Sequence, residues 1–204
     1  MCGGLGFKIE MPKVNNLRTE DLNQEQLADL IEAINTGHDY QAVNFMRMPL
    51  FSGMRRGEFL KLKWEDVDFD RSFIHIRNPK GGKDQTITLN EAAREVLEHH
   101  PKSDSFFVFP GRGRNQRTSS PERIKAIRQK AGLPHDFRPL HTLRHTYASM
   151  LASSAKVDLY VLQRILTHKS AAMTKWDAHL RDDVLRRASN LAGTIIDRVV
   201  NNRG

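Results

Sequence analysis

The sequence has a single cysteine, Cys2, among its 204 residues, and it has no long apolar run. One thiol cannot form an internal disulfide and has no second cysteine with which to share a thiolate metal site. No stretch reaches the ~18 apolar residues that a membrane-spanning helix needs. The first residues also lack the apolar segment of a signal peptide, so we expect a cytoplasmic protein.

The composition is that of a globular domain, with 39% hydrophobic and 27% charged residues. The length suits one domain, which can bury an adequate core without disulfides or metals. Residues 1–18 contain three glycines and no periodicity, which indicates a linker or a truncated edge. Residues 19–204 are predicted to form the domain.

The net charge of +8 is concentrated in one stretch. Between residues 111 and 130 there are seven Lys and Arg residues against one Glu. This run is either a solvated loop and helix face or a surface that contacts nucleic-acid phosphates. The candidate phosphate contacts in it are Arg112, Arg114, Arg117, Arg123, Lys125 and Arg128.

Hydrophobic periodicity predicts a mainly α-helical fold with a small antiparallel three-stranded β-sheet. Strands are expected within 67–76, at 86–89 and at 106–109. Helices are expected from about Thr19 to Gly37 and over 40–51, 55–62, 90–99, 121–131, 141–153, 159–166 and 183–199. The last helix carries an apolar stripe that could pack on its own domain or on a neighbouring copy: Val184, Ala188, Leu191, Ile195 and Val199.

Several cations lie beside apolar elements and need an anionic partner. Arg55 follows a glycine break, and Arg144 lies between Leu143 and Tyr147. Together with a lysine in a Gly-rich turn and nearby histidines, two arginines without clustered carboxylates suit a phosphate. A zinc helix built on His141 and His145 is disfavoured, because Thr142 stands where zinc proteases of this spacing have Glu.

Four segments carry a resemblance to the tyrosine recombinases, the phage-integrase family. Residues 52–58 (SGMRRGE) resemble the family's first arginine box, and 141–146 (HTLRHT) resemble the second. Residues 166–170 (LTHKS) are similar to its Leu-Gly-His box, and Lys80 lies in a turn between two strands, where the family keeps a lysine. The resemblance covers roughly residues 19–199. It implies that residues 19–204 form a tyrosine-recombinase (DNA breaking-rejoining) catalytic fold.

The resemblance also implies a reaction. In this family a tyrosine attacks a DNA phosphodiester, forms a 3′-phosphotyrosyl link and releases a 5′-hydroxyl, without metal or other cofactor. The implied site residues are Arg55 and Arg144 as clamps on the phosphate oxygens, Lys80 as the proton donor to the leaving oxygen, His141 in proton transfer, His168 as a phosphate hydrogen-bonding group, and Glu58 as the residue that orients an arginine.

The nucleophile position departs from the family pattern. Asp177 stands nine residues after His168, where the resemblance implies tyrosine, and the flanking residues 173–180 still match. A carboxylate is too short, and too negative beside a phosphate, to be a good substitute. The chain is therefore predicted to be deficient in strand cleavage, as an engineered trap or a decayed element. A second hypothesis is that Asp177 binds the Arg55 and Arg144 cluster in place of DNA.

The implied partner is double-stranded DNA, with self-association on DNA through the C-terminal helix and no membrane. The implied role is site-specific recombination or integration by a bacterial, phage or mobile-element protein at the nucleoid. We expect the chain to lack the N-terminal DNA-binding domains that are usual in the family. Two alternatives stay open: a non-catalytic DNA-binding regulator, and a type IB topoisomerase-like enzyme, which the compact spacing disfavours.

Overall fold

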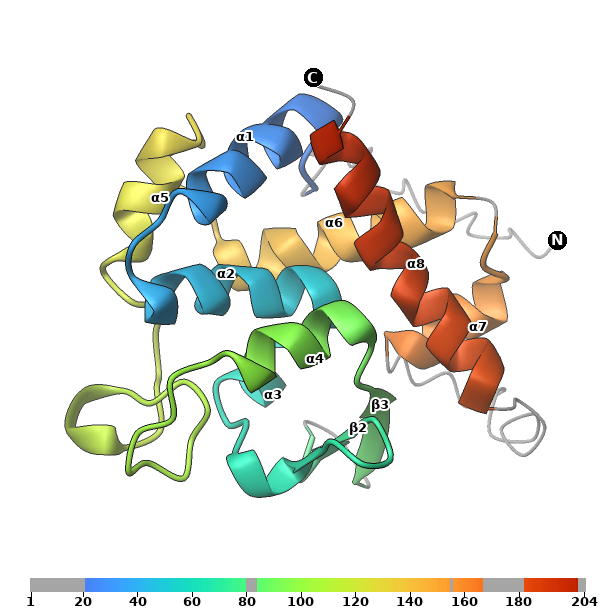
Figure 1. Cartoon of the computed structure of the whole chain (residues 1–204), viewed down its shortest axis with the longest axis horizontal. Helices are drawn as coiled ribbons and strands as arrows, with labels where there is room; N and C mark the ends of the chain where they lie inside the picture. The colour runs from blue at the N-terminus through green and yellow to red at the C-terminus, as the bar shows by residue number, and fades with distance from the viewer. Residues whose placement is uncertain (1–20, 80–83, 155, 167–181, 202–204) are drawn as a thin grey trace, which may run out of the picture.

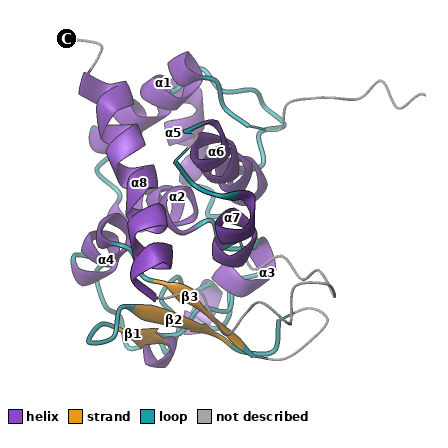
Figure 2. Cartoon of the chain, turned by 90° about the vertical axis from the view of Figure 1, so that its right-hand side faces the viewer, coloured by secondary structure: helices purple, strands orange, loops and turns teal. Residues whose placement is uncertain are grey.

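Helices make up most of the molecule, and a small sheet lies at one end of them (Figures 1 and 2). This computed structural model describes residues 21–79, 84–154, 156–166 and 182–201. Within those ranges, no helix combines the length and the apolar character needed to cross a membrane. The helices are α1 (Gln24–Asn35), α2 (Tyr40–Ser52), α3 (Arg56–Phe59), α4 (Glu91–Glu98), α5 (Ile124–Lys130), α6 (Pro139–Ser153), α7 (Leu159–Ile165) and α8 (Asp182–Asn201).

Each predicted helix is present, although some begin later or are shorter than expected. The first begins at Gln24 rather than near Thr19, because Asn23 forms a capping box with Gln26. The Asn23 Oδ1 accepts a hydrogen bond from the Gln26 amide at 2.8 Å, and the Gln26 Oε1 accepts one from the Asn23 amide at 3.1 Å. Such a reciprocal cap satisfies amides that the first helical turn leaves open.

The sheet is three-stranded and antiparallel, as predicted, but one strand was assigned wrongly. Its order is β1 (Val67–Asp68), β2 (Phe73–Ile76) and β3 (Gln85–Thr88). The predicted stretch 67–76 is split by a turn in which Ser72 has a φ of 60°. Ile74 in the central strand therefore faces Val67 on one side and Ile87 on the other.

Residues 106–109 do not form the expected third strand. They lie alongside the loop that comes after α3 instead, and a single β-bridge joins Lys63 to Phe107. The Val108 amide donates to the Leu62 carbonyl at 2.9 Å, and Phe109 is buried, whereas Phe106 is 81% exposed. An apolar run of this length cannot by itself distinguish a strand from a buried loop.

The main core surrounds α2, which lies between α1 and α4 with α6 behind it (Figure 1). Phe45 of α2 makes edge-on contacts with Phe59 at 5.0 Å and Phe109 at 5.8 Å between ring centroids. Aromatic pairs in this arrangement add to the free energy of apolar burial.

A second, smaller cluster joins α6, α7 and α8. Its buried members are Tyr147, Leu151, Leu162, Ile165, Leu166 and Ala192. The C-terminal helix thus packs within its own chain, one of the two arrangements that the sequence left open. Its most buried residues are Ser189, Ala192 and Ile196, whereas Ala188, Leu191 and Val199 of the predicted stripe are partly buried beside them.

Candidate active site

Arg55 is positioned by the turn between α2 and α3. Gly53 ends α2 in the left-handed conformation, with a φ of 61°, and Arg55 then occupies the N-cap of α3. One Glu58 oxygen accepts from the Arg55 amide and the other from its Nη1, both at 3.2 Å. The Glu58 side chain is only 7% exposed and that of Arg55 is 37% exposed. The carboxylate can therefore orient the guanidinium at the edge of a groove.

Gly53 is also a point of close approach between helices. A Cβ atom at this position would lie 2.6 Å from Cδ1 of Tyr147 on α6, and 3.3 Å from a methyl of Leu166. The positive φ and this contact both require glycine. The first arginine box therefore packs directly on the helix that carries the second.

Arg144 joins the three sequence boxes through its guanidinium. Its Nη1 donates to the carbonyl of Gly53, in the first box, and its Nη2 donates to the carbonyl of Leu166 at 2.6 Å. Gly53 and Leu166 are the C-cap residues of α2 and α7. The carbonyls at a helix C-terminus carry partial negative charge, so a cation is favoured there.

Burial and charge both act on Arg144. Desolvation is the main cause that lowers its pKa to about 10, and the neighbouring charge of Arg55 lowers it further, while Glu58 opposes the shift. The charged guanidinium would therefore gain from an added anion. Two adjacent cations with a single buried carboxylate form an electrostatic environment that favours phosphate.

The two histidines of the second box lie one turn apart on α6. The rings of His141 and His145 pack at 4.4 Å between centroids with 64° between their planes. Among the described side chains, no group of three His, Cys, Asp or Glu residues is placed to hold a metal ion.

One groove of about 670 Å³ contains three of the predicted catalytic residues, Arg55, His141 and Arg144. Lys125 and Arg128 of α5 line the same groove. Arg56, Arg138 and His145 also line it, together with one acidic residue, Glu122, so segments that are far apart in the sequence make this groove strongly basic.

The rest of the basic stretch is divided among other contacts. Arg117 donates to the Pro110 carbonyl at 2.5 Å and lies over the Phe45 ring, and burial lowers its pKa. Arg123 pairs with Asp39 at 2.6 Å, and Arg114 pairs with Asp104 at 2.8 Å. Arg112 is exposed in a short 3₁₀ helix (Arg112–Arg114) in the segment that precedes α5. Arg117 is therefore a packing residue, whereas the others stay on the surface.

Lys80, His168 and Asp177 lie outside the described residues. The third box can be followed as far as Leu166, whose carbonyl accepts from Arg144.

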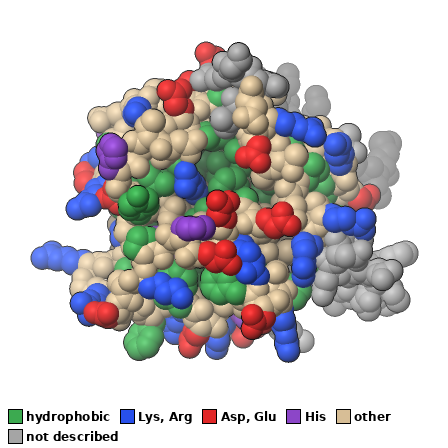
Figure 3. Space-filling view, in the orientation of Figure 1, with side chains coloured by type: hydrophobic (Ala, Val, Ile, Leu, Met, Phe, Trp, Pro, Cys, Tyr) green, Lys and Arg blue, Asp and Glu red, His purple; other side chains and the backbone are tan. Residues whose placement is uncertain are grey.

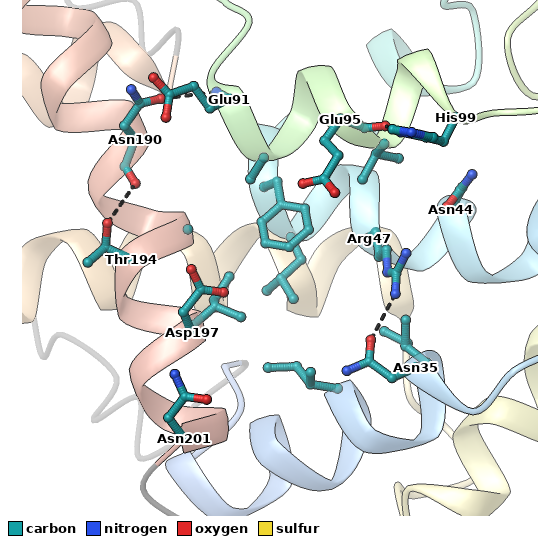
Figure 4. A pocket seen from close by; sticks show the side chains of 18 residues that line it. Asn35, Asn44, Arg47, Glu91, Glu95, His99, Asn190, Thr194, Asp197 and Asn201 are labelled. Carbon is teal, nitrogen blue, oxygen red and sulfur yellow. Dashed lines mark hydrogen bonds between the residues drawn. The ribbon is translucent and has the colours of Figure 1, made fainter.

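A second cavity, of about 660 Å³, was not anticipated from the sequence (Figures 3 and 4). It lies between α1, α2, α4 and α8, with an apolar floor visible in the hollow of Figure 3. Arg47 faces it and donates to Asn35 Oδ1 at 2.8 Å, and burial lowers the Arg47 pKa while Glu95 opposes the shift. Its lining comes from four helices, so no local motif marks it.

Comparison with known proteins identifies the family. Residues 20–183 match the Phage integrase family, and the chain belongs to that family. It is 27% identical over 174 residues to the tyrosine recombinase XerA of Pyrococcus furiosus, a match covering 82% of this chain and 60% of the relative. It is 26% identical to XerA of Thermococcus onnurineus, covering 92% of this chain and 68% of the relative. The chain thus spans about 60–68% of the length of these two curated relatives.

Solved structures show the same fold. A crystal structure of XerA recombinase superposes with a TM-score of 0.61 at 29% identity, covering 82% of this chain and 62% of that one. XerH bound to its difH substrate gives 0.59 at 22% identity, over 78% and 50% of the two chains. The lambda integrase catalytic core gives 0.57 at 18% identity, over 73% and 95%. The predicted fold class, a tyrosine-recombinase catalytic domain with a small three-stranded sheet, is confirmed.

Proposed function

We propose that this chain binds double-stranded DNA as the catalytic-type domain of a site-specific recombinase. The observation that carries the proposal is the placement of Arg144, which bonds backbone carbonyls of the first and third boxes and shares a groove with Arg55 and His141. Among similar proteins of known structure, the Tn1549 transposon integrase was solved in complex with circular intermediate DNA and XerH with its difH substrate. The same proposal assigns the protein to the cytoplasm, where bacterial or phage DNA lies.

The geometry leaves donors available for a phosphate. A guanidinium has five N–H groups, and two of those on Arg144 face backbone carbonyls. The others can donate to the non-bridging oxygens, and Arg55, oriented by Glu58, can complete the clamp. Donors held in place before the reaction stabilise charge as it develops on a phosphoryl group. His141 would assist proton transfer, Lys80 would protonate the leaving 5′-oxygen, and His168 would hydrogen-bond the phosphate.

The basic side chains around the clamp are proposed to contact the DNA backbone. Lys125 and Arg128 lie in the groove and would touch phosphates next to the scissile one. Arg112, Arg114 and Arg123 would add weaker contacts from the surface. Each neutralised phosphate releases counterions, so affinity should fall steeply with salt.

Asp177 is proposed to make the chain deficient in strand cleavage. It occupies the position at which the family resemblance implies a tyrosine. Tyrosine and aspartate differ in reach, and a displacement of ~1 Å can cost about 100-fold in rate.

The test uses a duplex selected from a random library by binding to this chain, prepared with a nick so that cleavage traps a covalent adduct. The unaltered chain should shift the duplex in a gel without forming an adduct. Asp177→Tyr should form one, and Asp177→Phe, which supplies the ring without the hydroxyl, should not. An adduct with the unaltered chain would contradict the cleavage deficiency. Failure to bind DNA even at low salt would contradict the whole proposal.

A second candidate function, a DNA-binding regulator that occupies sites without cutting, is favoured by Asp177 alone. Tight binding together with an inactive Asp177→Tyr variant would support it. We also propose that copies of the chain associate on DNA through α8. This would require α8 to give up its packing against the other helices of its own chain. Cross-linking of DNA-bound copies through α8 would detect it.

A further inference from the structure

A buried polar network joins α8 to three other helices. Ser189 of α8 is 2% exposed, and its Oγ lies 3.0 Å from Asn90 Nδ2 and 3.1 Å from the hydroxyl of Tyr147 on α6. The Asn90 amide also donates to the Phe51 carbonyl of α2 at 2.7 Å and caps α4 by accepting from the Ala93 amide at 2.8 Å. Four helices therefore meet at one hydroxyl and one amide.

The network leads to the clamp arginine through Tyr147. The Tyr147 ring packs against Gly53, close enough to leave no room for a Cβ atom. The Gly53 carbonyl accepts from Arg144 Nη1. Tyr147 itself is fully buried, and burial raises its pKa to about 12. Its hydroxyl is thus a neutral group whose partner is supplied by α8.

These hydrogen bonds constrain the orientation of α8 more than apolar packing alone would. Apolar contacts would bury the α8 face equally well, whereas hydrogen bonds fix the rotation and height of a helix against its neighbours. An unmade bond at a buried hydroxyl is costly, so the bonded geometry is strongly preferred. A shift of α8 must either break the hydrogen bond between Ser189 and Tyr147 or displace the Tyr147 side chain. In the second case the Tyr147 ring, which packs against Gly53, moves as well.

We propose that Tyr147 and Ser189 are positioning residues for Arg144, which couple the seating of α8 to the geometry of the phosphate clamp. Neither side chain touches the substrate groove. The proposal rests on the proposed function, in which Arg144 grips the phosphate. Removal of the α8 bond should therefore disturb the arginine before it unfolds the domain.

Two neighbouring residues of α6 provide a matched test. Tyr147→Phe removes a buried hydroxyl that bonds α8. Thr146→Val removes a buried hydroxyl, in a residue that is 1% exposed, which accepts from the Leu22 amide at 2.9 Å, just before α1, and donates to the Thr142 carbonyl at 3.0 Å. Both changes keep the side-chain shape, and each should lower the melting temperature by about 2–4 °C. Only Tyr147→Phe should affect the clamp.

The first measurement is the Nε–Hε signal of Arg144 in heteronuclear NMR of the unaltered chain, assigned by its loss in Arg144→Lys. Tyr147→Phe and Ser189→Ala should shift or broaden this signal, and Thr146→Val should leave it in place. The second measurement is single-turnover cleavage in the Asp177→Tyr background. There Tyr147→Phe should slow adduct formation roughly tenfold, because small displacements of a catalytic group are costly.

An unchanged Arg144 signal in both α8-contact variants would overturn the proposal. So would equal slowing by Tyr147→Phe and Thr146→Val, because a general loss of stability would then explain both. If Asp177→Tyr forms no adduct while the Arg144 signal still responds to Tyr147→Phe, the cleavage chemistry fails and the coupling stands. A double variant, Tyr147→Phe with Ser189→Ala, should cost less than the sum of the single changes.

Discussion

The main core and the small cluster that joins α6, α7 and α8 differ in the kinds of contact that hold them together. The main core surrounds α2 with aliphatic and aromatic side chains, among them Phe45, Phe59 and Phe109. The small cluster has few members and includes a buried tyrosine bonded to a buried serine. Arg144 lies at the seam between them, because it bonds Gly53 on one side and Leu166 on the other.

This difference separates stability from positioning. Apolar burial is non-directional and scales with area, so the larger core should supply most of the folding free energy. Hydrogen bonds contribute less net free energy but prescribe orientation. The small cluster should therefore matter more for the site than its size suggests.

The largest expected effect is in the main core. Leu30→Ala, at a fully buried position of α1, should destabilise the domain by about 3–5 kcal/mol through lost burial and a residual cavity. Denaturant unfolding followed by circular dichroism measures the change. At temperatures where the variant is folded, DNA affinity should match that of the unaltered chain. A loss below about 1 kcal/mol would mean that this core is not the main source of stability.

Leu151→Ala makes the same chemical change in the small cluster, where Leu151 is equally buried. The expected loss is smaller, about 2–3 kcal/mol, because partly buried neighbours on α7 and α8 can move into the space. The same unfolding experiment checks it. Unlike Leu30→Ala, this variant should also weaken DNA binding in a gel shift, since it loosens the cluster that supports Arg144. Equal DNA affinity in the two variants would remove the distinction between the regions.

Tyr147→Phe should show a pH-dependent effect of about 1 kcal/mol below pH 10. Burial raises the Tyr147 pKa from 10.0 to about 12, so between these values the folded chain keeps a proton that the unfolded chain releases. Stability from this group is therefore present below pH 10 and falls as the pH rises toward 12. Arg144, whose pKa is lowered from 12.5 to about 10, acts in the opposite direction in both chains.

The measurement for Tyr147 is the difference in unfolding free energy between the unaltered chain and the variant, at about pH 9 and about pH 11. The advantage of the unaltered chain should shrink at the higher pH. A constant difference would show that the tyrosine is not protected by burial.

The smallest effect at the site is expected for Glu58→Gln, at roughly 0.5–1 kcal/mol, because the amide oxygen can still accept from the Arg55 backbone. The exposed pair of Arg94 and Glu98, joined at 2.8 Å on α4, provides the control. Glu98→Gln should cost less than about 0.5 kcal/mol, since surface ion pairs contribute little. Thermal melts of both variants give the comparison, and a larger loss for Glu98→Gln would contradict it.

Much of the fold was predictable from local patterns. The helices from α1 to α8 follow apolar periodicity, but the exact start of α1 was not predicted, because the cap at Asn23 was passed over in favour of Thr19. The strand prediction failed at 106–109, because an apolar run buried against the loop after α3 has no ladder partner beyond the bridge to Lys63. The two strands within 67–76 were merged, because a left-handed serine at 72 has no strong turn signal.

The candidate site was predictable as a set of residues but not as an arrangement. Motif spacing indicated Arg55, Glu58, His141 and Arg144, and the described part of the structure places these four around one turn and one groove. The basic stretch was predicted as one surface, yet Arg117 packs on Phe45 while Lys125 and Arg128 line the groove. Charge runs along a sequence do not specify which side chains a neighbouring helix will cover.

The sequence by itself determined the family, the helical periodicity and the identity of the clamp residues, because each is encoded within a few neighbouring positions. Only the tertiary structure decided that Arg144 bonds carbonyls 91 residues before it and 22 residues after it, and that Ser189 of the last helix reaches Tyr147. Such contacts depend on how helices pack, and packing is set by the summed burial of many side chains rather than by any local motif.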